Sequence, residues 1–204
     1  IDEPIAAAIG AGLPISEATG SMVVDIGGGT TEIAVLSLGG VVYANSLRVA
    51  GDAMDTAIIT YMRKQFNLLV GEASAEKIKK EIGTALPTSN NTYLMKGRDI
   101  RSGTPKEITL KEEDTSEALK PVLNQILGGI KDALEKTPPE LSSDIHSNGI
   151  HLTGGGAQIR GLDKLIEERT TLKVYIPKDP LLSIVKGAGA VLENYAEMKK
   201  VCIS

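Results

Sequence analysis

The stretch VVDIGGGTTEIAV, residues 23–35, joins two apolar runs through an aspartate, three glycines and two threonines. The first run predicts a buried strand over residues 21–27 that carries the carboxylate of Asp25 near its end. Glycines lack a Cβ, so backbone N–H groups at such a turn can approach phosphate oxygens closely. A carboxylate repels phosphate but suits a hydrated Mg²⁺ that bridges to phosphate oxygens. The stretch therefore predicts a phosphate loop with a metal-facing aspartate, or alternatively a glycine-rich hairpin turn with an aspartate cap.

A second glycine turn lies in LTGGGAQIRGL, residues 152–162, where a predicted strand leads into a helix. Three glycines let the backbone lie flat against a ligand, and a helix N-terminus favours negative or polar groups. A glycine-rich turn without a ligand is the alternative. Neither turn is a P-loop, because G-x-x-x-x-G-K-[ST] does not occur. The first turn is not a Rossmann fingerprint either, because antiparallel strand patterns follow it instead of a helix.

The patterns around the two turns indicate an α/β fold. Three strand patterns over 21–27, 31–38 and 41–49, with Gly39-Gly40 between the last two, predict an antiparallel meander. A helix follows at residues 51–66. The further predicted elements are a short helix capped by Ser74 and stopped by Gly83, strands at 92–96 and 106–110, the longest helix at 117–136, a strand at 172–176 and a mostly helical segment at 180–199. Pro121 should lie near the first turn of the longest helix or bend it.

Composition and charge bound the class of protein. The chain has 204 residues and a formal net charge of −4, which argues against nucleic-acid binding. Its one cysteine, Cys202, cannot form an internal disulfide, so a reducing cytoplasm is expected. No apolar run approaches the roughly 18 residues of a membrane span, and no signal peptide opens the chain. Because the chain opens without methionine on a helical pattern, we expect a piece of a longer protein.

Taken together, the two turns resemble the actin/Hsp70/sugar-kinase superfamily, in which a D-x-G-G-G-T motif is the second phosphate loop and a later G-G-G contacts adenosine. Within that superfamily the sequence resembles the MreB family of bacterial actin homologues, which form filaments and set rod shape. The resemblance covers nearly the whole chain and corresponds to the second half of such proteins. The segments that carry it are EPIAAAIGAGLP, GSMVVDIGGGTTEIAVLSLGGVV, AGDAMDTAI, GEASAEKIKKEIG, KTPPELSSDI and LTGGGAQIRGLDKL.

The resemblance implies an actin-like ATPase fold of RNase H-like type, represented by its second-half subdomains only. Residues 1–50 and 113–204 would form the RNase H-like subdomain, corresponding to actin subdomain IIA. Residues 51–112 would form a small inserted α+β subdomain, corresponding to actin subdomain IIB.

The resemblance also implies roles for individual residues. Asp25 would hold Mg²⁺ through water, and Glu3 would orient the attacking water with help from Thr30. From the residues alone, Glu3 also fits an exposed glutamate at a helix start, and residues 76–79 fit a solvated helix face. The implied ATP contacts are Gly27, Gly28, Gly29 and Thr30 in the first turn, Glu76, Lys77, Ile78 and Lys79 in the small subdomain, and Gly154, Gly155, Gly156 and Ala157 in the second turn.

The implied function is that of a rod-shape-determining cytoskeletal protein that binds ATP and Mg²⁺, forms filaments and hydrolyses ATP. A chain that lacks the first half is expected to be inactive as an ATPase. Expected partners are further copies of the protein, the inner face of the cytoplasmic membrane and cell-wall synthesis proteins, with no nucleic acid. The expected location is the cytoplasm, with membrane association of the full-length protein. The alternatives are a plasmid-segregation actin, a small-molecule kinase, an Hsp70-like ATPase, or a nucleotide-free fragment that only self-associates.

Overall fold

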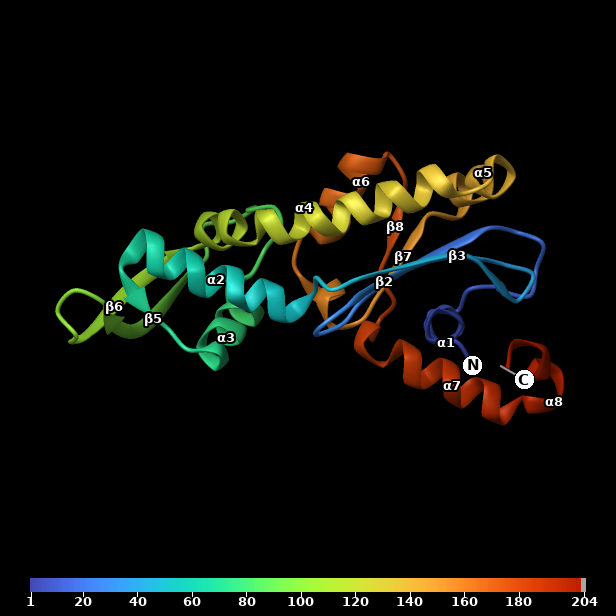
Figure 1. The fold of residues 1–204 in the computed structure, drawn as a ribbon, viewed down its shortest axis with the longest axis horizontal. Coiled ribbons are helices and arrows are strands. Elements are labelled where there is room, and N and C mark those ends of the chain that lie inside the picture. Colours follow the sequence, from blue (N-terminus) through green and yellow to red (C-terminus); the bar gives the residue numbers. More distant parts are fainter. Residues whose placement is uncertain (203–204) are drawn as a thin grey trace.

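A computed structural model describes residues 1–202 and contains, within them, two β-sheets connected by helices (Figure 1). None of the helices in this part of the chain is long and apolar enough to span a membrane. The strands are β1 (Ser21–Ile26), β2 (Thr31–Ser37), β3 (Gly40–Leu47), β4 (Leu68–Leu69), β5 (Thr92–Asp99), β6 (Pro105–Lys111), β7 (Ile150–Thr153) and β8 (Val174–Tyr175). The helices are α1 (Glu3–Gly10), α2 (Gly51–Phe66), α3 (Glu72–Ile82), α4 (Glu112–Lys136), α5 (Pro139–Asn148), η1 (Gly155–Gln158), α6 (Leu162–Thr170), η2 (Pro180–Leu182), α7 (Ser183–Glu193), α8 (Tyr195–Met198) and η3 (Lys199–Val201).

The larger sheet has the strand order β3-β2-β1-β7-β8. Strands β1, β2 and β3 pair antiparallel, so the predicted meander is confirmed. Strand β7 pairs parallel with β1 and with β8. In the parallel register Asp25 lies opposite Thr153, and each of these residues is followed within two positions by a glycine turn. The sheet therefore brings the two turns to the same edge.

Strand β1 is buried along its whole length because both faces of the larger sheet are covered. Met22, Val24 and Ile26 belong to the main core, which also takes in side chains of α2 and α4. Val23 points to the opposite face and joins a second core formed with α1 and α7. This arrangement explains why the sequence shows a continuous apolar run instead of an alternating one.

The smaller sheet has the order β4-β5-β6 and lies at the opposite end of the molecule from α1 and α7 (Figure 1). All of its pairings are antiparallel. The sheet and helices α2 and α3 fall within residues 51–112, which we propose as the inserted subdomain. Its apolar side chains are continuous with the main core, since Ile78 and Leu110 belong to the same cluster as Val24.

The longest helix, α4, differs from the sequence prediction at its N-terminus. It begins at Glu112, not at residue 117, and Pro121 lies inside it. The carboxylate of Asp114 accepts a hydrogen bond from the backbone N–H of Lys111 at 2.9 Å, which caps the true start. The predicted start was wrong because the apolar pattern begins only after the acidic first turn of Glu112, Glu113 and Asp114. Pro121 lies in the interior, where packing compensates for the one hydrogen bond that proline removes.

Other element boundaries also differ from the predictions. Helix α3 begins at Glu72 with Gly71 as its N-cap, so the Ser74 cap was wrong, whereas the stop at Gly83 is confirmed. Helix α5 and the short strand β4 were not predicted, and the strand expected at 172–176 is reduced to β8. The mostly helical segment predicted over 180–199 is confirmed and consists of η2, α7, α8 and the start of η3.

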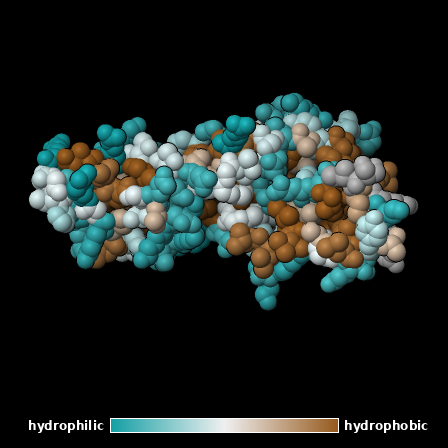
Figure 2. Space-filling model, turned by 60° about the horizontal axis from the view of Figure 1, so that its bottom comes forward, coloured by the Kyte–Doolittle hydropathy of each residue, from teal (hydrophilic) through white to brown (hydrophobic). Residues whose placement is uncertain are grey.

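Helices α1 and α7 approach each other with almost no side chain between them. A Cβ at Gly10 would overlap the carbonyl of Ser183, and one at Gly187 would overlap the carbonyl of Ala6. The face of α7 turned away from α1 keeps exposed apolar side chains, among them Val185. Figure 2 shows apolar surface over η2 and α7.

Candidate functional site

The first glycine turn connects β1 to β2 and is tied to the start of α2. The N–H of Gly27 donates to the carbonyl of Thr30 at 2.9 Å, which closes the turn. The N–H groups of Gly51 and Asp52 donate to the carbonyls of Gly27 and Gly28 at 3.1 and 2.8 Å. Gly28, Gly29 and Thr30 are exposed although the strands on both sides are buried. The turn therefore offers free backbone at the edge of the sheet.

Asp25 is held at the end of β1 by a residue of the neighbouring strand. The hydroxyl of Thr153 donates to Asp25 Oδ1 at 2.7 Å, and the aspartate is only 5% exposed. Burial raises the pKa of Asp25, the hydrogen bond from Thr153 lowers it, and the nearby charge of Glu32 raises it, with a net upward direction. One carboxylate oxygen is thus fixed in place by a bond that joins the ends of β1 and β7.

The second glycine turn packs directly on the end of β1. Gly154 has a φ of +81°, and a Cβ there would overlap the main chain of Ile26. A Cβ at Gly156 would overlap the side chain of the same isoleucine. The N–H of Gly154 donates to the carbonyl of Pro180 at 2.9 Å, so η2 is attached to this turn. These two glycines are required by close packing, whatever the turn binds.

Helix α3 presents polar side chains on one face. Lys79 Nζ donates to the carbonyl of Gly51 at 2.9 Å and forms an ion pair of 2.8 Å with Asp55. Burial raises the pKa of Asp55, and the hydrogen bond and charge of Lys79 lower it, with a net upward direction. Glu76 and Lys80 form an exposed ion pair at 2.7 Å. Lys79 therefore connects α3 to the start of α2.

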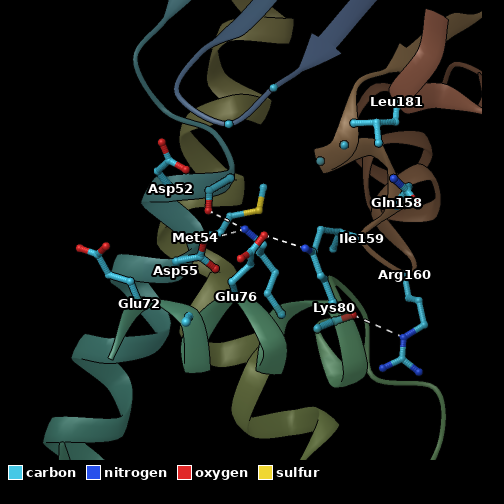
Figure 3. A pocket seen from close by; sticks show the side chains of 18 residues that line it. Asp52, Met54, Asp55, Glu72, Glu76, Lys80, Gln158, Ile159, Arg160 and Leu181 are labelled. Atoms are coloured by element: carbon cyan, nitrogen blue, oxygen red, sulfur yellow. Dashed lines mark hydrogen bonds and ion pairs between the residues drawn. The ribbon is translucent and has the colours of Figure 1, made fainter. Parts of the chain in front are cut away.

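A cavity of about 890 Å³ lies between the first turn, helices α2 and α3, and the second turn (Figure 3). Its volume is in the range of small-molecule and cofactor sites. Two groups of residues face each other across it. We call Glu72, Glu76, Lys79 and Lys80 the α3 wall, and Gly155, Gly156 and Ile159 the η1 wall. Of the residues predicted to contact ATP, those that line this cavity are Gly27, Gly28, Glu76, Lys79, Gly155 and Gly156.

The remaining predicted residues lie outside the cavity lining. Ile78 is fully buried in the core on the opposite face of α3, so its side chain does not face the cavity. Lys77 is exposed on another face of the helix. Glu3 is exposed at the start of α1. The others are Asp25, Gly29, Thr30, Gly154 and Ala157, which belong to the turns but are not part of the lining. The roles assigned to all these residues stay predictions.

The structure adds lining residues that the sequence reasoning did not assign. Asp52 and Asp55 come from the first turns of α2, and Glu72 comes from the start of α3. Arg160 and Leu181 follow the second turn and lie on the far side (Figure 3). The signal for the first pair was present as carboxylates three residues apart directly after the strand pattern. Nothing local marks Arg160 or Leu181, because their positions depend on long-range packing.

The site residues fit a nucleotide with a hydrated magnesium ion. Within residues 1–202 no group of three or more histidine, cysteine, aspartate or glutamate side chains could hold a metal by itself. Mg²⁺ keeps several waters and is commonly held by one or two carboxylates together with substrate phosphates. Asp25 can provide such a carboxylate. A Cβ at Gly28 would meet only Asp52 within 4 Å, so the first turn has open space beside its backbone.

Comparison with known structures defines the class of protein. The chain is similar to the crystal structure of MreB5 of Spiroplasma citri bound to AMPPNP, with a TM-score of 0.93 and 36% identity, covering 98% of this chain and 60% of that one. It shares its fold with the MamK double helical filament, with a TM-score of 0.78 and 24% identity over 94% of this chain and 58% of that one. The fold is therefore the actin-like ATPase fold, as the sequence predicts.

The sequence comparisons define the family. The family model described as MreB/Mbl protein matches residues 1–200. The chain is 53% identical to the cell shape-determining protein MreB of Escherichia coli (strain K12) over 194 residues, 95% of this chain and 56% of that protein. It is 42% identical to the cell shape-determining protein Mbl of Bacillus subtilis (strain 168) over 200 residues, 98% of this chain and 60% of that protein. The chain belongs to the MreB/Mbl family and spans a little over half the length of these relatives.

Proposed function

We propose that the protein to which this chain belongs binds ATP with Mg²⁺, hydrolyses it and forms cytoskeletal filaments that determine rod shape. The observation that carries the proposal is the single cavity that joins the two glycine turns and the α3 wall. Family membership supports the same function, since the curated relatives are cell shape-determining proteins. The related Spiroplasma citri protein binds AMPPNP, a nucleoside triphosphate analogue.

The residues of the first turn account for binding of the phosphates. Free backbone at Gly28 and Gly29 lies where no Cβ blocks the approach of an oxygen. Asp25 would hold the metal through water, and bound Mg²⁺ would neutralise developing charge on the phosphates. Asp52 lies beside the turn and disfavours a bare phosphate there, which is consistent with a requirement for the metal.

The nucleoside would lie between the α3 wall and the η1 wall. Glu76 and Lys80 are exposed, so their polar groups are available for the ribose. Lys79 is largely committed to Asp55 and Gly51, which makes it a support of the wall as well as a predicted contact. Thr30 and Glu3 are the residues proposed to orient water for attack, the water losing its proton as it attacks the terminal phosphorus.

The test is sedimentation and negative-stain microscopy of the full-length protein, with ATP and Mg²⁺ or without nucleotide, on lipid vesicles. Nucleotide-dependent filaments on the vesicles are the expected result. Soluble particles under all conditions would contradict the cytoskeletal function and favour the kinase or chaperone-like alternatives, which a screen of phosphoryl acceptors would then separate.

The role of Asp25 has a separate test. Asp25→Ala in the full-length protein should weaken ATP binding in the presence of Mg²⁺ and have little effect when Mg²⁺ is chelated, measured by calorimetric titration. Asp132→Ala is the control, because Asp132 is an exposed aspartate of α4 that does not line the cavity. Equal ATP affinities of the wild type and Asp25→Ala with Mg²⁺ would exclude Asp25 as the metal carboxylate.

A further inference from the structure

Arg160 lies where the η1 wall ends and holds the segment that follows α3. Its carbonyl accepts hydrogen bonds from the N–H of Ala85 at 2.8 Å and from the hydroxyl of Thr84 at 3.0 Å. Its guanidinium Nε and Nη2 donate long hydrogen bonds of 3.4 Å to the carbonyls of Gly83 and Glu81 at the C-terminal end of α3. In Figure 3 the side chain extends from the η1 side toward the end of that helix.

The third guanidinium nitrogen of Arg160 reaches a buried carboxylate. Nη1 lies 3.1 Å from Oε1 of Glu112, the first residue of α4, whose side chain is 2% exposed. The same carboxylate accepts hydrogen bonds from the N–H groups of Thr88 and Ser89, the hydroxyl of Ser89 and the amide of Asn91, at 2.8 to 3.1 Å. Glu112 thus connects α4, the loop before β5 and Arg160, two residues after η1. We call Arg160, Glu112 and these bonded groups the Arg160 cluster.

The Arg160 cluster connects the two walls of the cavity. Gly83 directly follows α3, the helix that carries the α3 wall, and its carbonyl contacts Arg160. Ile159 of the η1 wall directly precedes Arg160. The first glycine turn is held differently, by α2 through Gly51 and Asp52. The Arg160 cluster therefore links the two walls, whereas none of its contacts reaches the first turn.

We propose that Arg160 and Glu112 are positioning residues that hold the α3 wall and the η1 wall at the spacing that accepts the nucleoside part of a nucleotide. This inference rests on the proposed ATP binding and assigns a function to two residues that the sequence reasoning did not single out. A site whose walls are held in place before binding spends less free energy on ordering them when the ligand arrives.

Arginine suits this position because its planar group has donors in a fixed fork. It contacts the carboxylate with one nitrogen and main-chain carbonyls with the other two. A lysine can neutralise Glu112, but its three donors share one nitrogen and lack the planar fork that spreads the contacts of Arg160. Charge and geometry can therefore be separated by substitution.

The experiment compares binding of ATP and of inorganic tripolyphosphate, both with Mg²⁺, to the full-length protein by calorimetric titration. The variants are Arg160→Met, Arg160→Lys and Glu112→Gln. The matched controls are Lys120→Met and Glu117→Gln, which break an exposed ion pair of 3.3 Å farther along α4. Thermal unfolding of each protein is recorded in parallel.

Arg160→Met and Glu112→Gln should weaken ATP binding about tenfold and leave tripolyphosphate binding within about twofold of wild type. Arg160→Lys should recover most of the melting temperature yet still bind ATP more weakly than wild type. The control variants should bind both probes as wild type does. If Arg160→Met does not fold, Arg160→Lys and Glu112→Gln provide the same comparison.

Equal losses of affinity for ATP and tripolyphosphate would show a merely structural role and overturn the inference. The same conclusion would follow if Arg160→Lys recovered both its melting temperature and its full ATP affinity. Unchanged ATP binding in all three variants would also overturn it. In each of these cases the proposed function would still stand, provided that the wild-type protein binds ATP. Absence of ATP binding to the wild type would instead refute the proposed function, and the positioning role with it.

Discussion

The two glycine turns have the same three-glycine pattern but need their glycines for different reasons. At Gly28 and Gly29 an added Cβ would meet nothing within 4 Å except carboxylate oxygens of Asp52, at 3.6 Å and beyond. At Gly154 and Gly156 it would overlap Ile26. The first turn keeps open space beside its backbone, whereas the second is a packing junction on the end of β1. A glycine run is therefore evidence of close approach, and only the structure tells whether a ligand or the protein itself is the neighbour.

The largest effect should follow from substitution in the second turn. Gly154→Ala places a side chain at a φ of +81° and against the main chain of Ile26. We expect the free energy of unfolding to fall by about 3 kcal/mol or more, because backbone strain and overpacking both contribute. Urea unfolding followed by circular dichroism measures it. The matched control is Gly28→Ala, which should lose less than about 1 kcal/mol, and similar losses in the two variants would remove the distinction between the turns.

The second effect concerns the anchoring of the second turn through Arg160. Burial raises the pKa of Glu112, but the hydrogen bonds from Ser89, Thr88 and Asn91 outweigh it and lower this pKa from 4.5 to about 2. The stabilisation by ionised Glu112 is therefore complete above pH 4.5 and is lost as the pH falls toward 2. Glu112→Gln should cost about 2–3 kcal/mol at neutral pH.

This difference between wild type and Glu112→Gln should shrink as the pH is lowered, measured by urea unfolding at a series of pH values. Glu117→Gln, on the exposed surface of α4, serves as the control and should cost less than about 1 kcal/mol. A Glu112→Gln difference that stays constant down to about pH 2 would contradict the assignment of the depressed pKa.

A smaller effect should follow from breaking the bond between the ends of β1 and β7. Thr153→Val keeps the shape of the side chain but removes the donor to Asp25, at a cost of about 1–2 kcal/mol. The already raised pKa of Asp25 should rise further, so the cost should decrease at acid pH, where the carboxyl group is protonated. Thr153→Ser, which keeps the hydroxyl, should lose less. An equal loss for serine and valine would show that the methyl group matters and the bond does not.

The smallest effect on stability, and the one that is specific to binding, concerns the first turn. Gly28→Ala should unfold almost as the wild type does but bind ATP about tenfold more weakly in the full-length protein, because the added methyl group occupies space proposed for phosphate. Calorimetric titration checks this. Gly71→Ala is the control, since a Cβ there meets nothing within 4 Å and the residue does not line the cavity. If the ATP affinity of Gly28→Ala is unchanged, the phosphates do not bind beside Gly28.

The sequence alone was a good guide to the fold and a partial guide to the cavity. The meander was predictable because a continuous apolar run, alternation and a glycine pair are local signals. The start of α4 was not, because its acidic first turn precedes the apolar pattern and is held by contacts with distant segments. Six of the predicted ATP contacts line one cavity, but Ile78 does not, since a sequence run cannot tell which face of α3 points inward.

By itself, the sequence determined where the chain turns, that the strand over residues 21–27 is buried, and that this strand carries a carboxylate near its end, directly before the glycines. These properties depend on residues close together in the chain. Only the tertiary structure decided that Thr153 bonds to Asp25, that Ile26 occupies the space above the second turn, and that Arg160 reaches Glu112. Each of these contacts joins segments distant in sequence, and which partner a side chain meets there is set by packing of the whole molecule.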